Sequence, residues 1–155
     1  MAYKEQYDRM RRWYEKFSSL TSGRLHDIPS ENYIDDVYAF FLNAYHLKDW
    51  IKNDNGIPKN VQDLVENYIN GKAHLSLCAD ICNSLKHLKL DGRGSRSGEN
   101  PAFGRKQYGL ALGAAPTTIA LKYEVVLDSG ATIDAFEIAT GCVKAWDEFF
   151  QAHKL

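Results

Sequence analysis

The sequence lacks any apolar run approaching the ~20 residues that a membrane-spanning helix requires. It is also poor in cysteine: there are three, an odd number, and Cys78 and Cys82 stand one helical turn apart. This pattern argues against a disulfide framework and indicates reduced thiols in a core. Residues 1–17 are charged throughout and lack the apolar segment of a signal peptide. We therefore expect a cytoplasmic protein without a membrane partner.

An excess of charge of either sign is missing as well. The formal net charge is −1 over 155 residues, so nothing attracts nucleic acid or an anionic membrane to the chain as a whole. Any such contact needs a local patch. Hydrophobic residues make up 45% of the sequence, which is enough for one genuine core. We expect a single domain that spans residues 1–155.

The sequence does have helical periodicity. Apolar residues recur at three- and four-residue spacing over residues 3–20, 31–53, 61–70, 72–88 and 134–153. Breakers such as Asn55-Gly56 separate these segments, and Asp134 is suited to cap the last one. The sequence therefore predicts a mainly α fold: a bundle of four main helices plus a short helix, with a β-hairpin inserted before the C-terminal helix.

The predicted hairpin covers residues 117–133. Apolar residues alternate there with smaller or polar ones, as in a half-buried strand. The alternating residues are Ile119, Leu121, Tyr123 and Val125. Asp128-Ser129-Gly130 is typical of a tight turn, after which residues 131–133 can return as a second strand.

The stretch from Asp91 to Gly113 is rich in glycine and in positive charge. It holds six of the eleven glycines, which do not follow the G-x-G-x-x-G spacing of a dinucleotide-binding loop. Because such a chain buries little apolar area, we expect a mobile basic loop at 91–113. Its cations, together with Lys86, are candidates for contact with RNA phosphates, and a solvated linker is the alternative. These cations are Arg93, Arg96, Arg105 and Lys106.

A polar stripe runs along the helix predicted at 72–88. At ~100° per residue its members fall within roughly one third of the circumference, opposite an apolar stripe that contains both Cys78 and Cys82. The members are Ser76, Asp80, Asn83, Ser84 and His87. A solvated face is one interpretation. Asp, Asn and Ser form helices poorly, however, so their choice favours a closely approaching surface or a site held at fixed geometry.

His46 and Asp49 stand one turn apart on the helix predicted at 31–53. Both are candidates to support the polar stripe from a neighbouring helix. For His46 the favoured interpretation is a core histidine satisfied by hydrogen bonds.

Two metal sites are weaker alternatives. A site within the bundle would use His46, Asp49, Asp80 and His87, but it lacks the Glu-x-x-His motif that is typical of such sites. A site on one helix face would use His74, Cys78 and Cys82, but its cysteines fit the core better. We expect no metal and no cofactor.

The segment CADICNSLKHLKL, together with AYHLKDWI, looks like the signature of small bacterial proteins of the HEPN superfamily (higher eukaryotes and prokaryotes nucleotide-binding). The resemblance implies a domain of four or five helices. Many members are metal-independent ribonucleases of toxin–antitoxin and phage-defence systems, and active members build one cleft from two protomers. Their motif is an Arg, a polar residue, three variable residues and a His. Asn83 and His87 match it, whereas Cys82 occupies the Arg position.

This departure bears on the chemistry. In metal-free RNA cleavage a histidine moves a proton, and a fixed cation stabilises the charge that develops on the phosphate. Cys82 is neutral, so a substitute such as Lys86, Arg93 or Arg96 would be needed. We therefore expect a non-catalytic member that acts through RNA or a protein partner, with a homodimer formed through the polar stripe. The alternatives are an active ribonuclease that uses His87, Asn83 and Asp80, and a helical-bundle metalloenzyme.

Overall fold

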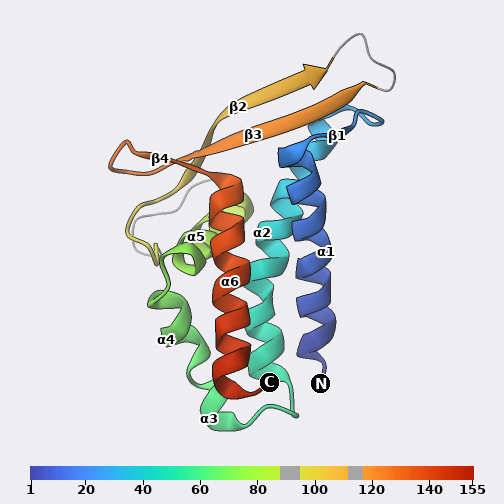
Figure 1. The fold of residues 1–155 in the computed structure, drawn as a ribbon. Coiled ribbons are helices and arrows are strands. Elements are labelled where there is room, and N and C mark those ends of the chain that lie inside the picture. Colours follow the sequence, from blue (N-terminus) through green and yellow to red (C-terminus); the bar gives the residue numbers. More distant parts are fainter. Residues whose placement is uncertain (88–94, 112–116) are drawn as a thin grey trace.

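A computed structural model describes residues 1–87, 95–111 and 117–155, and Figure 1 shows how their helices and strands are arranged. The helices are α1 (Tyr3–Ser22), α2 (Ser30–Asn53), α3 (Lys59–Gln62), α4 (Val65–Asn70), α5 (Ala73–His87) and α6 (Ala135–His153). The strands are β1 (Arg24–Leu25), β2 (Ala102–Ala111), β3 (Thr118–Val126) and β4 (Thr132–Asp134). The four long helices lie where the periodicity predicted them. The predicted short helix at 61–70 is divided between α3 and α4.

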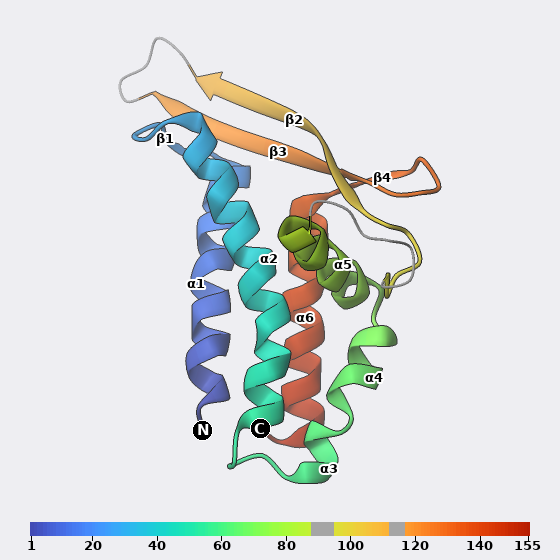
Figure 2. The ribbon, with the colours of Figure 1, turned by 180° about the vertical axis from the view of Figure 1, so that it is seen from behind.

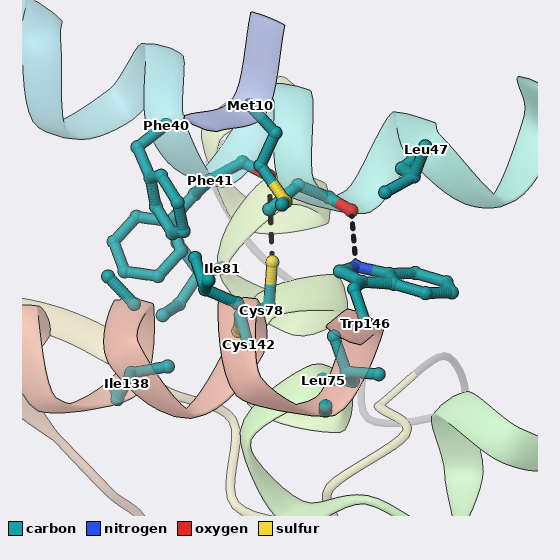
Figure 3. Close-up of a cluster of buried hydrophobic side chains, with 14 of the residues drawn as sticks. Met10, Phe40, Phe41, Leu47, Leu75, Cys78, Ile81, Ile138, Cys142 and Trp146 are labelled. Atoms are coloured by element: carbon teal, nitrogen blue, oxygen red, sulfur yellow. Dashed lines mark hydrogen bonds between the residues drawn. The ribbon is translucent and has the colours of Figure 1, made fainter. Parts of the chain in front are cut away.

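The core lies between the long helices, whose apolar faces meet in the interior. Trp146 of α6 is fully buried, and its indole N–H donates a hydrogen bond of 3.0 Å to the carbonyl of Ala44 in α2. Beside it, the Cys78 thiol of α5 donates to the carbonyl of Phe41 at 3.5 Å (Figure 3). These contacts satisfy the polar groups that the aromatic and sulfur side chains bring into the core. They also fix α5 and α6 against α2. Within the described residues, each helix is either too short or too polar to cross a lipid bilayer.

A sheet of four antiparallel strands lies across one end of the bundle (Figures 1 and 2). β3 is its central strand, with β2 on one side and with β1 and β4 on the other. Alternate residues of β3 are buried against the helices: Ile119, Leu121, Tyr123 and Val125. The Tyr38 and Tyr123 hydroxyls, 3.1 Å apart, join α2 to this face.

The hairpin prediction is confirmed, with small changes at its ends. β3 and β4 pair from Glu124↔Asp134 to Val126↔Thr132, and Gly130 takes a positive φ of 81° in the turn. Asp134 caps α6, because its side chain accepts a hydrogen bond of 2.8 Å from the Phe136 N–H. The strand alternation and the capping residue were therefore sufficient signals at this point of the chain.

The prediction of a mainly α bundle is wrong, because the hairpin is only part of a four-stranded sheet that forms a substantial layer. Residues 102–111, predicted as part of a mobile basic loop, form the long strand β2 instead. β1, which lies between the helices predicted at 3–20 and 31–53, adds to the other side of β3. The physical reason is that β3 offers a complete backbone edge, which outweighs the low strand propensity of a glycine-rich segment.

One glycine of that stretch has a specific use in the strand. The register of β2 on β3 shifts between Phe103 and Lys106, and Gly104 lies within this irregularity. A Cβ on Gly104 would stand 2.6 Å from the Val126 Cγ2, closer than packing allows. Gly104 therefore permits a close approach of two strands, although the glycine-rich composition of residues 91–113 had indicated a loop.

Candidate functional site

The predicted polar stripe is divided between buried and accessible positions. Ser76 and Asp80 are 3% and 0% exposed, so the first half of the stripe is part of the interior. Asn83 and Ser84 are half-buried and Lys86 is exposed. His87 ends α5, and its side chain lies outside the described part of the chain.

Asp80 is held by the segment that follows the helix. Its Oδ1 accepts a hydrogen bond of 2.7 Å from the Arg96 N–H. Its Oδ2 accepts from the Ser95 hydroxyl at 2.8 Å, the Ser97 hydroxyl at 2.6 Å and the Ser97 N–H at 2.9 Å. A buried carboxylate of this kind requires full hydrogen bonding, and here it receives four bonds. Asp80 therefore meets a closely approaching surface, one of the interpretations that the sequence left open.

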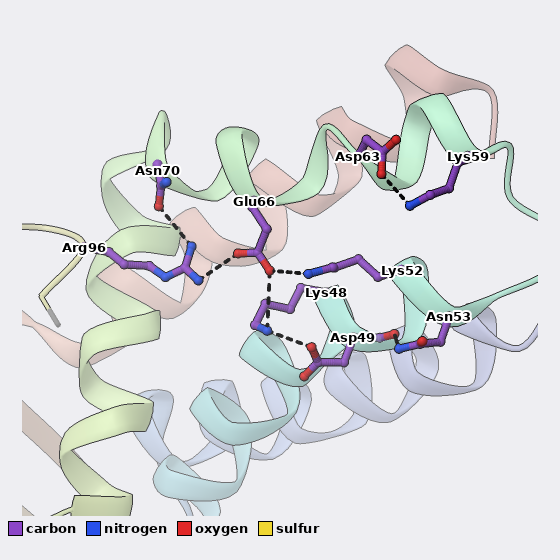
Figure 4. A network of polar contacts seen from close by, with 9 residues as sticks. All are labelled: Lys48, Asp49, Lys52, Asn53, Lys59, Asp63, Glu66, Asn70 and Arg96. Carbon is purple, nitrogen blue, oxygen red and sulfur yellow. Dashed lines mark hydrogen bonds and ion pairs between the residues drawn. The ribbon is translucent and has the colours of Figure 1, made fainter.

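The side chain of Arg96 extends from this anchor into a network of charges (Figure 4). Its guanidinium donates to Glu66 at 2.7 Å and to the side-chain oxygen of Asn70 at 3.0 Å. Lys52 donates to the other oxygen of Glu66 at 2.7 Å, and Lys48 stands 3.8 Å from it. Burial alone would raise the pKa of Glu66, but the hydrogen bonds from Lys52 and Arg96 and the nearby charges hold it at about 2. This network fixes residue 96 against α2 and α4.

Cys82 occupies the position where the HEPN motif has arginine. The side chain is nearly enclosed, at 4% exposed. Burial, with a smaller effect from Cys78, raises the pKa of the Cys82 thiol to about 12, although Lys48 and Lys86 are close enough to oppose this shift. The thiol is therefore neutral at physiological pH and supplies neither a nucleophile nor a cation.

His46 and Asp49 lie on the outside of α2. Both are exposed, so the interpretation of His46 as a core histidine is wrong. Asp49 accepts a hydrogen bond of 2.7 Å from Lys48, whereas Asp80 is directed to residues 95–97. In the ranges that the structure describes, no three His, Cys, Asp or Glu side chains are grouped so that they could hold a metal ion.

Among the described residues, the cations assigned to the basic stretch do not form one patch. Arg96 is bound within the Glu66 network, and Arg93 lies outside the described residues. Arg105 and Lys106 are exposed on β2, where the Lys106 ammonium lies 5.4 Å from the centre of the Tyr123 ring.

Two surface hollows of similar size occur elsewhere. One, of about 500 Å³, lies between α1 and α6 and includes Tyr7, whose hydroxyl donates to Asp147 at 2.6 Å. The other, of about 490 Å³, lies beside the Asp80 anchor and is lined by Arg96 and Ser97 among others. Neither is lined by Asn83 or Cys82, so the motif positions do not open into a substrate-sized space in either of them.

The fold and these contacts define a helical bundle capped by an antiparallel sheet, in which a buried aspartate of a central helix anchors the loop that leads into the sheet. Comparison of the chain with protein-family models, with curated proteins and with solved structures gave no match. The likeness to the HEPN superfamily is therefore carried by the residues of α2 and α5 quoted above.

Proposed function

We propose that the protein is a catalytically silent, HEPN-like module that acts by binding another protein. The observation that carries this proposal is the environment of Asp80, whose carboxylate accepts four hydrogen bonds from residues 95–97. A general acid or base must be free to exchange a proton with a substrate. Asp80 is enclosed and fully bonded, so it serves the fold.

The cations near the motif support the same proposal. Metal-free cleavage of RNA needs a positive group aimed at the phosphate. Arg96 is bound to Glu66, and Lys48 is bound to Asp49. Each would have to break an ion pair before it could contact an RNA phosphate, which weakens it as a substitute for the missing arginine.

A homodimer through the polar stripe is not part of the proposal. Ser76 and Asp80 are buried within the chain itself, and residues 95–97 already cover Asp80. A second copy would have to displace this segment in order to reach them. An open surface is found on the sheet, where residues 104–110 of β2 are exposed.

A second candidate function is metal-independent RNA cleavage, with a lysine in place of the motif arginine. The observation in its favour is that the charges of Lys48 and Lys86 act on the Cys82 thiol, whose pKa they lower against the larger effect of burial. In this version His87 would transfer the proton and one of these lysines would face the phosphate.

Incubation of the purified protein with mixed single-stranded and structured RNA in chelator separates the two candidates. The matched variants are His87→Ala and Lys48→Gln. We expect no cleavage by any of the three proteins and no salt-sensitive RNA binding. Cleavage by the native protein that is lost in His87→Ala would overturn the proposal, and its additional loss in Lys48→Gln would establish the second candidate.

A further inference from the structure

In the part of the chain that the structure describes, one backbone edge of strand β2 is free. The order β1-β3-β2 places it at the margin of the sheet, and its pairings are all with β3. Among the described residues, no strand lies on its other side. Both ribbon views show β2 as the strand farthest from the helices (Figures 1 and 2). Unpaired N–H and C=O groups along such an edge can bind a further extended chain.

The edge also carries uncovered apolar side chains. Tyr108 pairs with buried Leu121, and Leu110 pairs with buried Ile119, so both lie on the face of the sheet that is directed toward the helices. The helices do not cover them: Tyr108 is 41% and Leu110 is 48% exposed. Edge strands are usually protected by charges or by an irregularity. In β2 the irregularity ends at Lys106, and the second half of the strand, which pairs regularly with β3, has no such protection on its outer edge.

The charged side chains of β2 itself are positive. One acid acts on this strand as well, since burial and, to a smaller extent, Glu31 of α2 raise the pKa of Tyr108. Arg105 and Lys106 are exposed, and Lys122, beside Gln107 on β3, is exposed as well. Residues 102–111 contain no acidic side chain. A second copy of β2 would bring two Arg105-Lys106 pairs onto adjacent strands, where like charges repel. An acidic segment would instead find complementary charge.

We propose that the free edge of β2 binds an extended, acidic segment of another protein, which adds to the sheet as a fifth strand. The inference rests on the proposed function, because it names the partner through which a catalytically silent module acts. Backbone hydrogen bonds hold the segment, its carboxylates meet Arg105 and Lys106, and its apolar side chains cover Tyr108 and Leu110.

Fluorescence anisotropy with labelled peptides tests the proposal on the full chain. The first probe is a ten-residue peptide with glutamate residues in one half and valine residues in the other. Lys106, Tyr108 and Leu110 all pair with buried residues of β3 and so share one face of the sheet, which a strictly alternating peptide could not match. The second has the same sequence with alternate backbone nitrogens methylated, which keeps the charge but prevents strand addition. The third is a lysine–valine peptide, and the fourth is a single-stranded RNA oligonucleotide.

The matched variants change the charge equally at two places. R105E/K106E reverses the charge of the β2 edge, and R12E/K144E reverses two exposed cations on the helices. We expect the acidic peptide alone to bind, at least tenfold more weakly after methylation or in R105E/K106E, and unchanged in R12E/K144E. Stronger binding at low salt is expected as well.

Four results would overturn the proposal. The first is that the acidic peptide does not bind at up to ~1 mM, and the second is that the methylated peptide binds equally well. The third is that the RNA probe binds and the acidic peptide does not. The fourth is that light scattering finds a native dimer that the substitutions R105E/K106E dissociate. The first and last leave the proposed function standing, since it is tested separately by the assays of RNA cleavage and RNA binding. RNA binding would overturn both proposals.

Discussion

Ser97 donates two hydrogen bonds to one oxygen of Asp80, from its main-chain N–H at 2.9 Å and from its hydroxyl at 2.6 Å. The pairing joins the middle of α5 to a segment that lies 17 residues further along the chain. Charge-assisted bonds of this kind are stronger than neutral ones, and inside a protein they polarise one another. Asp80 thereby determines where the chain enters β2.

Replacement of Asp80 by asparagine tests this anchor. Asp80→Asn removes the charge, and its amide nitrogen cannot accept the bonds that one carboxylate oxygen now receives. We expect a loss of about 2–4 kcal/mol in the free energy of unfolding, measured by urea denaturation. The matched control is Asp63→Asn on the surface, where the side chain is 62% exposed and the loss should stay below about 0.5 kcal/mol. Equal small losses in the two variants would contradict the anchor.

Glu66 predicts a pH dependence of stability. Its pKa is about 2, below the ordinary value of 4.5, because Lys52 and Arg96 overcome the effect of burial. A depressed carboxyl pKa stabilises the folded state above pH 4.5, and this contribution is lost as the pH falls toward 2. Since the side chain is partly exposed, we expect Glu66→Gln to cost about 1 kcal/mol at pH 6 and progressively less below pH 4. Urea unfolding at a series of pH values measures how the free energy of unfolding depends on pH in the native protein and in Glu66→Gln. The same pH dependence in both proteins would contradict the lowered pKa of Glu66.

The contact between α5 and α6 depends on a glycine. A Cβ at Gly141 would overlap the imidazole ring of His74. Gly141→Ala should therefore lower the unfolding free energy by about 1–3 kcal/mol, as overpacking usually does. The double variant that also carries His74→Ala should recover most of the loss. Thermal unfolding of the two variants and of His74→Ala alone measures the coupling, and additive effects would show that the two residues do not touch.

Cys82→Arg places an arginine where the proposed resemblance to the HEPN superfamily would require one. The position is 4% exposed, and Lys48 and Lys86 are close to it. A buried guanidinium among cations is unfavourable, so we expect a destabilisation of several kcal/mol, roughly 3 or more, and no RNA cleavage. Cys82→Ala, which removes only one buried sulfur, should cost about 1 kcal/mol. A stable Cys82→Arg protein that cleaves RNA would show that the arginine alone separates this chain from an active enzyme.

The helices could be predicted from the sequence because their apolar residues follow one period over many turns. β2 could not, since its Gly104 and Gly109 and its cations look locally like a loop, and the strand depends on the edge that β3 provides. His46 was misplaced for a related reason: α2 has apolar residues around most of its circumference, and its period does not show which side faces outward.

The candidate site was only partly accessible to sequence reasoning. Poor helix formers at Ser76 and Asp80 correctly indicated a special environment, but the residues that meet Asp80 come from another segment and have no motif of their own. Glu66 was missed altogether. One signal was available. Lys48 and Lys52 stand one turn apart on a predicted helix, where two like charges repel unless an acidic side chain lies between them.

Hydrogen exchange at the Arg96 and Ser97 amides tests most directly whether Asp80 serves the fold. Both amides donate to its carboxylate. We predict slow exchange in the native protein by NMR. In Asp80→Asn these two amides should exchange at least tenfold faster relative to the amide of Val143 in the core. Rapid exchange in the native protein would contradict the anchor, because the carboxylate would then be free for chemistry.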